Sequence, residues 1–162
     1  MSHPLHMFGL AAGVTLTLAV PAWSQDVSAW NAERANLFSR VCMATAPTFA
    51  GLSRALGEQG FHDMQGQLVH EPEVVVSLTT DGQTCTCYMT MGAPEPNSLT
   101  MTVFQQLLTD FPNAWAPQNA QGAVNDTSFV RDGVPVRLLL SPAEIDGAYW
   151  LAARVIVPGA CS

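Results

Sequence analysis

The sequence predicts an α+β domain built around one antiparallel sheet. Two Asp-Gly pairs, at positions 81–82 and 132–133, each join two runs of strand-type residues, the pattern of a β-hairpin. Other segments carry apolar residues at the 3.6-residue spacing of an amphipathic helix. Of the 162 residues, 48% are hydrophobic and 12% are charged, which excludes a disordered chain and a coiled coil.

An apolar run from Phe8 to Ala22 opens the chain and has the features of a secretory signal peptide. It is shorter than the roughly 20 residues that span a bilayer. Ala22 and Ser24 place small residues three and one positions before a cleavage after Ser24, although the segment before the run lacks Lys and Arg. Cleavage after Ala22 and a buried N-terminal helix are the alternatives. We expect residues 1–24 to be a leader and residues 25–162 to be a single domain, periplasmic or secreted.

Two helices are expected at the start of the mature chain, as a helical hairpin or a kinked helix. Ser28 can cap a helix that runs to about Thr45. Its apolar stripe is Trp30, Leu37, Phe38, Val41 and Cys42. Pro47 suits the first turn of a second, shorter helix that stops at Gly60. The side chains that this helix would bury are Phe49, Leu52 and Leu56.

The segment around Asp81-Gly82 predicts a hairpin with a two-residue turn. In that register Val76 lies opposite Cys87, and Leu78 lies opposite Cys85. Because cross-strand partners share a face, the hairpin would have one apolar surface that includes both cysteines. Its members are Val74, Val76, Leu78, Cys85, Cys87, Met89 and Met91.

A third helix and a long loop are expected after the hairpin. Ser98 can cap a helix from Leu99 to about Phe111. Its predicted buried stripe is Met101, Phe104, Leu108 and Phe111. Residues 112–126 are polar and rich in Pro, Asn, Gln and Gly, and they hold Trp115. A loop of that length is commonly functional.

The remaining chain predicts a three-stranded meander. Two strands flank Asp132-Gly133, and a third strand begins at Ala148 and runs to Pro158. Over residues 73–157 the elements therefore follow the order ββ-α-βββ. This order loosely resembles the profilin-like and PAS-like arrangement, in which a helix crosses between a hairpin and a meander. The resemblance rests on element order alone, so it implies a fold and no function.

The four cysteines of an exported chain predict two disulfides. Cys85 and Cys87 are alternate residues of one strand, about 6.6–6.8 Å apart, which is at the limit of disulfide geometry. We therefore expect Cys42 to bond to one of this pair and Cys161 to bond to the other. The order of the two pairings stays open.

The same strand also supports a metal hypothesis. Cys85, Cys87, Met89 and Met91 would present two thiols and two thioethers on one face, a soft ligand set suited to Cu(I). A periplasmic copper carrier is therefore the alternative function. Methionines on an apolar strand face are also ordinary core residues, in which case the strand binds no metal.

Charge and motifs narrow the function classes. The chain has six arginines, no lysine and thirteen carboxylates, for a net charge of −7. Such a surface disfavours phosphate contacts, so nucleic acid and anionic membranes are poor partners. No motif assembles a nucleophile, a base and an orienting group. We expect a non-enzymatic domain without a cofactor that binds a protein or a small ligand.

The candidate binding residues are Trp115, Trp150 and Arg154. Alternation in the last strand places Trp150, Arg154 and Ile156 on one face if Leu151 and its alternate neighbours are core. An aromatic residue beside an aliphatic residue and an arginine is typical of a protein-contact surface. The alternative is that the loop at 112–126 covers this face and that Trp115 stacks there.

Overall fold

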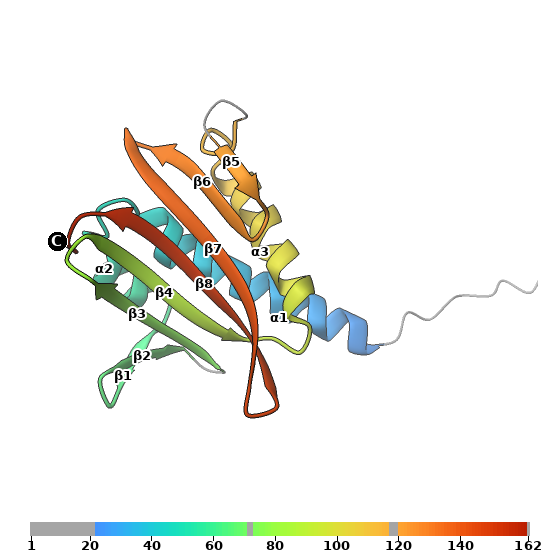
Figure 1. Ribbon diagram of the computed structural model, residues 1–162. Helices are drawn as coiled ribbons and strands as arrows, with labels where there is room; N and C mark the ends of the chain where they lie inside the picture. Colours follow the sequence, from blue (N-terminus) through green and yellow to red (C-terminus); the bar gives the residue numbers. More distant parts are fainter. Residues whose placement is uncertain (1–21, 71–72, 117–119, 162) are drawn as a thin grey trace, which may run out of the picture.

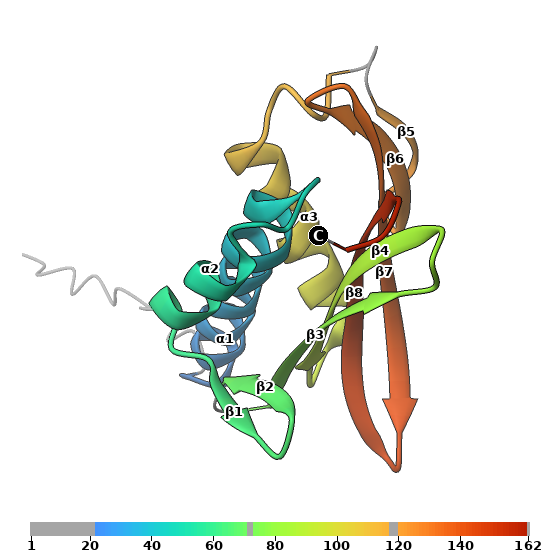
Figure 2. The ribbon, with the colours of Figure 1, turned by 90° about the vertical axis from the view of Figure 1, so that its left-hand side faces the viewer.

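The computed structural model describes residues 22–70, 73–116 and 120–161, with side chains from Val27 onward. It is an α+β structure in which an eight-stranded antiparallel sheet carries its helices on one face (Figures 1 and 2). The strands lie in the order β1-β2-β3-β4-β8-β7-β6-β5. In chain order the elements are α1 (Ala22–Phe38), the π-helical η1 (Ser39–Met43), α2 (Leu52–Glu58), β1 (His62–Met64), β2 (Gln67–His70), β3 (Val74–Thr80), β4 (Thr84–Gly92), α3 (Pro96–Asp110), β5 (Ala120–Ala123), β6 (Asp126–Arg131), β7 (Val134–Ile145) and β8 (Ala148–Pro158).

The first helix begins earlier than the sequence predicted. α1 starts at Ala22, so Ser28 lies inside the helix and does not cap it. The helical segment continues through η1 to Thr45, as expected. The predicted leader falls mainly on residues 1–21, which lie outside the described residues. No helix in the described ranges is long and apolar enough to span a bilayer.

The buried stripe of α1 and η1 largely follows the predicted spacing. Leu37, Phe38, Val41 and Cys42 are buried, and Trp30 is half-buried. The predicted core residues Phe49, Leu52 and Leu56 are also buried. α2 itself begins only at Leu52, so Pro47 lies in the turn before it and not in its first turn. These helices pack on the same face of the sheet as α3 (Figure 2).

The β3–β4 hairpin has the predicted faces and a different register. Val76 pairs with Met89 and Leu78 pairs with Cys87, two residues away from the expected partners. The turn spans four residues because the Asp81 Oδ1 accepts hydrogen bonds from the backbone N–H groups of Gln83 and Thr84, at 2.8 and 2.6 Å. A shift of two residues preserves the side-chain face. The apolar surface is therefore retained, although Leu78 is only half-buried.

The buried face of α3 is not the predicted one. The helix buries Leu99, Thr100, Val103 and Leu107, whereas Met101 and Leu108 are 46% and 40% exposed. Ser98 is not the cap, because the helix already begins at Pro96, a favourable residue for a first turn. Phe104 and Phe111 lie at the border of the buried face.

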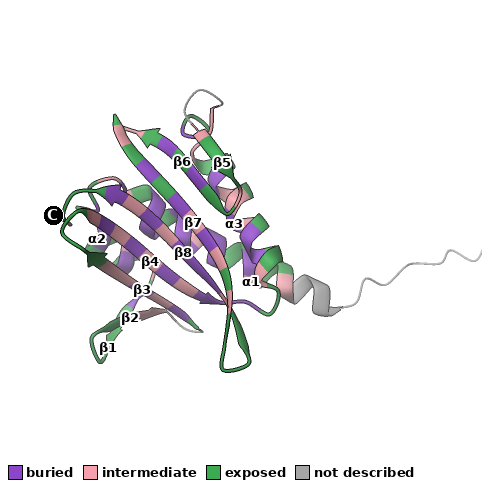
Figure 3. Ribbon diagram, viewed as in Figure 1, coloured by how far each residue is buried: buried purple, intermediate pink, exposed green. Residues whose placement is uncertain are grey.

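Three strands were not expected from the sequence. β1 and β2 form a short hairpin beside β3, with β1 exposed and β2 mostly half-buried, and β5 lies within the segment that was expected to be a loop. The predicted strands correspond to β3, β4, β6, β7 and β8, and the predicted Asp132-Gly133 turn joins β6 to β7. Burial alternates along the central strands, which places the core between the sheet and the helices (Figure 3).

Candidate functional site

Both cysteines of β4 are bonded to segments from the two ends of the chain. Cys42 bonds to Cys87, with the Cα atoms 5.6 Å apart, and Cys85 bonds to Cys161, with the Cα atoms 4.9 Å apart. This is the predicted connectivity, with the open choice between the two strand cysteines now assigned. The bonds tie β4 to η1 on one side and to the C-terminal segment on the other.

The proposed soft-metal ligands are built into the core. The sulfurs of Cys85 and Cys87 are both in disulfides, so neither offers a thiolate. Met89 and Met91 are fully buried, at 0% exposure. Within the described ranges, no group of three or more His, Cys, Asp or Glu side chains is placed to hold a metal ion. The four residues therefore pack the core of the oxidised protein.

Trp115 lies on the helix side of the sheet, so it does not cover Trp150. Its Nε1 donates a hydrogen bond to the backbone oxygen of Leu107 at 3.0 Å. Its ring contacts Phe104 and Phe129, with centroid distances of 5.4 and 4.7 Å. The expectation that Trp115 stacks on the outer face of β8 is therefore wrong. Trp115 instead lines a hollow of about 420 Å³ between α3 and β5.

One face of the sheet has no described helix over it (Figures 1 and 2). The other two candidates, Trp150 and Arg154, lie on that face, because they alternate along β8 with the buried residues of the core side. Arg154 stands between Tyr88 of β4 and Leu139 of β7 in the pairing across three strands. Ile156, one pair further along β8, is on the same face. We call Tyr88, Leu139, Trp150, Arg154 and Ile156 the open-face patch; all five are half-buried by their neighbours.

Trp150 is half-buried and has small cross-strand partners. Its cross-strand partners are Gly92 on β4 and Ala143 on β7. Neither residue has a side chain that can extend over an indole ring, although the Glu73 side chain occupies the space beside Gly92. A large aromatic side chain beside small ones on an uncovered sheet face is a suitable anchor for a partner.

Arg154 has no counter-ion among the residues that the structure describes. Its guanidinium carbon lies 5.0 Å from the centroid of the Tyr88 ring, within the range of a cation–π contact. It makes no ion pair with any residue that the structure describes. The open-face patch therefore combines apolar surface with one unpaired positive charge.

Arg137, a neighbour on the same face, provides a contrast. It donates two hydrogen bonds to the carboxylate of Asp126, at 2.9 and 2.8 Å. These bonds lower the pKa of Asp126 and raise the pKa of Arg137. Its charge is thus neutralised within the protein, whereas Arg154 has no carboxylate partner in the described part of the chain.

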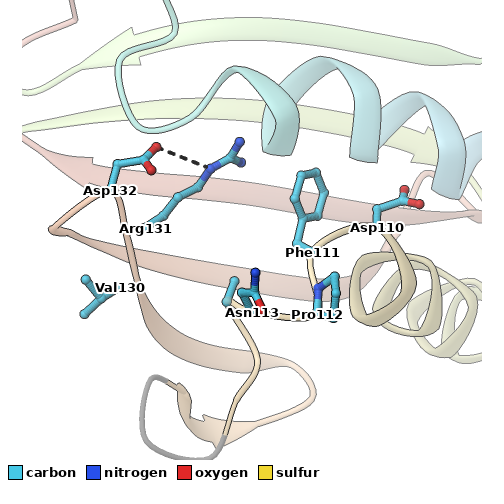
Figure 4. A pocket seen from close by; sticks show the side chains of 8 residues that line it. Asp110, Phe111, Pro112, Asn113, Val130, Arg131 and Asp132 are labelled. Carbon is cyan, nitrogen blue, oxygen red and sulfur yellow. Dashed lines mark ion pairs between the residues drawn. The ribbon is translucent and has the colours of Figure 1, made fainter.

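A third arginine, Arg131, joins the sheet to the helices at one end of the molecule (Figure 4). Its guanidinium donates to the backbone oxygens of Met43 and Ala44 and lies 4.9 Å from the centroid of the Phe111 ring. Burial lowers its pKa. A hollow of about 320 Å³ adjoins it, between the end of α3 and the β6–β7 turn. Nothing in the local sequence indicated this arrangement.

Comparison with protein-family models, with curated proteins and with solved structures finds no match. The loose likeness to the profilin-like and PAS-like arrangement therefore remains a prediction from element order.

Proposed function

We propose that the chain is an exported, non-enzymatic binding domain that holds a protein partner on the open-face patch. The proposal rests on the position of Arg154, which lies between Tyr88 and Leu139 on the sheet face that no described helix covers and has no ion pair among the described residues. Antiparallel sheets that face water usually carry polar side chains there. Here the uncovered face carries Trp150, Ile156 and Leu139, which favours a protein contact.

The chemistry of the patch specifies the kind of partner. The guanidinium favours a carboxylate in the partner. The aromatic and aliphatic side chains around it favour apolar residues next to that carboxylate. The whole chain has a net charge of −7, so a highly acidic partner would be repelled at long range. The partner is therefore a protein surface or segment with a single Asp or Glu among apolar residues.

The compartment is part of the same proposal. Two disulfides are consistent with an oxidising environment outside the cytoplasm. The expected leader at residues 1–24 would direct the chain to the periplasm or to secretion. The disulfides would keep the sheet rigid, which lowers the entropic cost of binding on its face.

Site-specific photocrosslinking in the cells that produce the protein tests the proposal. Benzoylphenylalanine is placed at Thr90, which pairs with Ala152 beside the patch, or at Gln105 on the exposed side of α3 as a control. A protein adduct is expected from Thr90 only. Arg154→Glu should abolish it, while Arg137→Glu, a matched charge reversal on the same face, should leave most of it.

Mass spectrometry of the adduct then identifies the crosslinked partner segment, which should contain an Asp or Glu flanked by apolar residues. Circular dichroism and the urea midpoint confirm that Arg154→Glu is folded. An adduct that persists in Arg154→Glu, or a crosslinked segment without a carboxylate, would contradict the proposal.

A further inference from the structure

A cleft of about 550 Å³ lies between η1, α2 and the β6–β7 turn, and it shares Arg131 and Asp132 with the hollow of Figure 4. Its volume is in the range of small-molecule sites, roughly 300–1,000 Å³. The charged side chains that line it are Arg40, Arg54, Arg131, Glu58 and Asp132.

Positive charge is concentrated in this cleft. Half of the six arginines line it, in a chain that has thirteen carboxylates and no lysine. The cleft lining has three arginines against two carboxylates. Asp110, in an adjoining hollow, already accepts hydrogen bonds from Ser39 and Gln106. An anion therefore finds locally favourable charge on a molecule that otherwise repels it.

The guanidinium groups of the cleft are only loosely neutralised. The Arg54 Nε lies 3.8 Å from Glu58, and the Arg131 Nε lies 3.9 Å from Asp132, both beyond hydrogen-bond distance. The Arg40 Nε donates to the neutral amide oxygen of Asn36 at 2.8 Å, and its charge also acts on Asp110, with which it forms no direct ion pair. Arg137, by contrast, is neutralised directly, because it donates two short hydrogen bonds to the Asp126 carboxylate.

The three arginines differ in how freely their guanidinium groups can move. The carbonyls of Met43 and Ala44 fix the Arg131 guanidinium, so its positive charge has a defined position in the cleft. Arg40 and Arg54 are exposed, and their planar groups can turn to bind a carboxylate with two hydrogen bonds. The lining between them is mixed: Ala44, Ala46, Pro47, Ala55 and Val134 are apolar, and Thr45 and Thr48 add polar groups.

We infer that this cleft is a binding site for a small organic carboxylate, with Arg40 and Arg54 as its carboxylate ligands. The apolar part of the lining would contact the organic body of such an anion, which inorganic phosphate lacks. The site is separate from the open-face patch, so it does not depend on the function proposed above.

Titration of the oxidised protein with sodium benzoate, followed by NMR of the arginine Nε–H groups at constant ionic strength, tests the inference. The Arg40 and Arg54 signals should shift and saturate, and inorganic phosphate should bind more weakly. Arg40→Gln and Arg54→Gln should each weaken benzoate binding about three- to fivefold, as exposed ion pairs do. Both sites are exposed, so both variants should fold.

Arg137→Gln removes the same charge elsewhere and is the matched control; it should leave benzoate binding unchanged. The inference is overturned if benzoate causes no saturable shift or if phosphate binds as tightly as benzoate. It is also overturned if Arg137→Gln weakens binding as much as Arg54→Gln, because the effect would then be that of overall charge.

Discussion

Arg34 is the largest side chain that the described core encloses, and it carries a charge. Its Nε donates to the backbone oxygen of Gly92 at 2.9 Å, and its guanidinium carbon lies 3.3 Å from the centroid of the Trp30 ring. Burial lowers its pKa to about 10, an effect that Glu33 and Glu73 partly oppose. Arg34 therefore stays protonated at neutral pH and links α1 to the end of β4.

Arg34→Met should lower the free energy of unfolding by about 2–3 kcal/mol, the range for a buried hydrogen bond from a charged group. The new side chain fills part of the space and cannot donate to Gly92. Urea unfolding measures the change. Arg40→Met, on the exposed side of the same helical segment, is the control and should shift stability by less than about 0.5 kcal/mol. Equal effects of the two substitutions would show that Arg34 has no special role.

Asp110 provides a pH-dependent contact between α3 and η1. Hydrogen bonds from the Ser39 hydroxyl and the Gln106 amide lower its pKa below the ordinary value of 3.8. Because the pKa is lower in the folded state, its contribution to stability is present above 3.8 and is lost as the pH falls through the lowered value.

Asp110→Asn should therefore be less stable than the natural protein at neutral pH, and the difference should vanish under strongly acidic conditions. Urea midpoints of the two proteins, measured between about pH 6 and pH 2, provide the comparison. A difference that stays constant over this interval would exclude a role for the Asp110 charge.

At the scale of the element, α3 offers a direct test of which helix face is buried. Leu107 is fully buried and Leu108 is 40% exposed, although the two are adjacent in the chain. Leu107→Ala should lower the free energy of unfolding by about 2–5 kcal/mol, whereas Leu108→Ala should cost less than about 1 kcal/mol. Thermal or urea unfolding of the two variants measures the difference. A larger loss of stability in Leu108→Ala would support the buried stripe that was predicted from the sequence.

The same helix explains what sequence patterns resolve and what they leave open. Both leucines belong to a set with helical spacing, so the period predicts the helix without its rotation. The β3–β4 hairpin is similar: a two-residue slip keeps every face, and only the hydrogen bonds of Asp81 fix the longer turn. β1 and β5 are mostly exposed, so they lack the alternation by which strands are detected.

The candidate site was predictable only along one strand. Alternation in β8 placed Trp150 and Arg154 on a shared outer face, as the structure has them. Tyr88 and Leu139 join them through the order β4-β8-β7, which brings together segments distant in sequence. The cleft lined by Arg40, Arg54 and Arg131 likewise forms only because the region of the β6–β7 turn contacts the end of η1. Tertiary arrangement of this kind has no local signal.

At the scale of the whole molecule, the two disulfides should dominate stability. Cys42–Cys87 closes a sequence separation of 45 residues and Cys85–Cys161 closes one of 76. The double substitution Cys42→Ala/Cys87→Ala should lower the free energy of unfolding by about 2–5 kcal/mol, measured in urea under oxidising conditions. The reduced natural protein should lose at least as much. An unchanged urea midpoint would mean that the bond contributes nothing to the folded state.

The connectivity of these bonds also sets the mechanical behaviour of the chain. Tension applied at the two ends would pass from Cys42 to Cys87, along two residues of β4 to Cys85, and across to Cys161, by covalent bonds throughout. Apart from the stretch from Cys85 to Cys87, the sheet and α3 belong to the two loops that these bonds close, so they bear none of the force. Pulled by its ends, the oxidised protein would keep some 400 Å of contour length hidden, at about 3.6 Å per residue, until a reductant releases it.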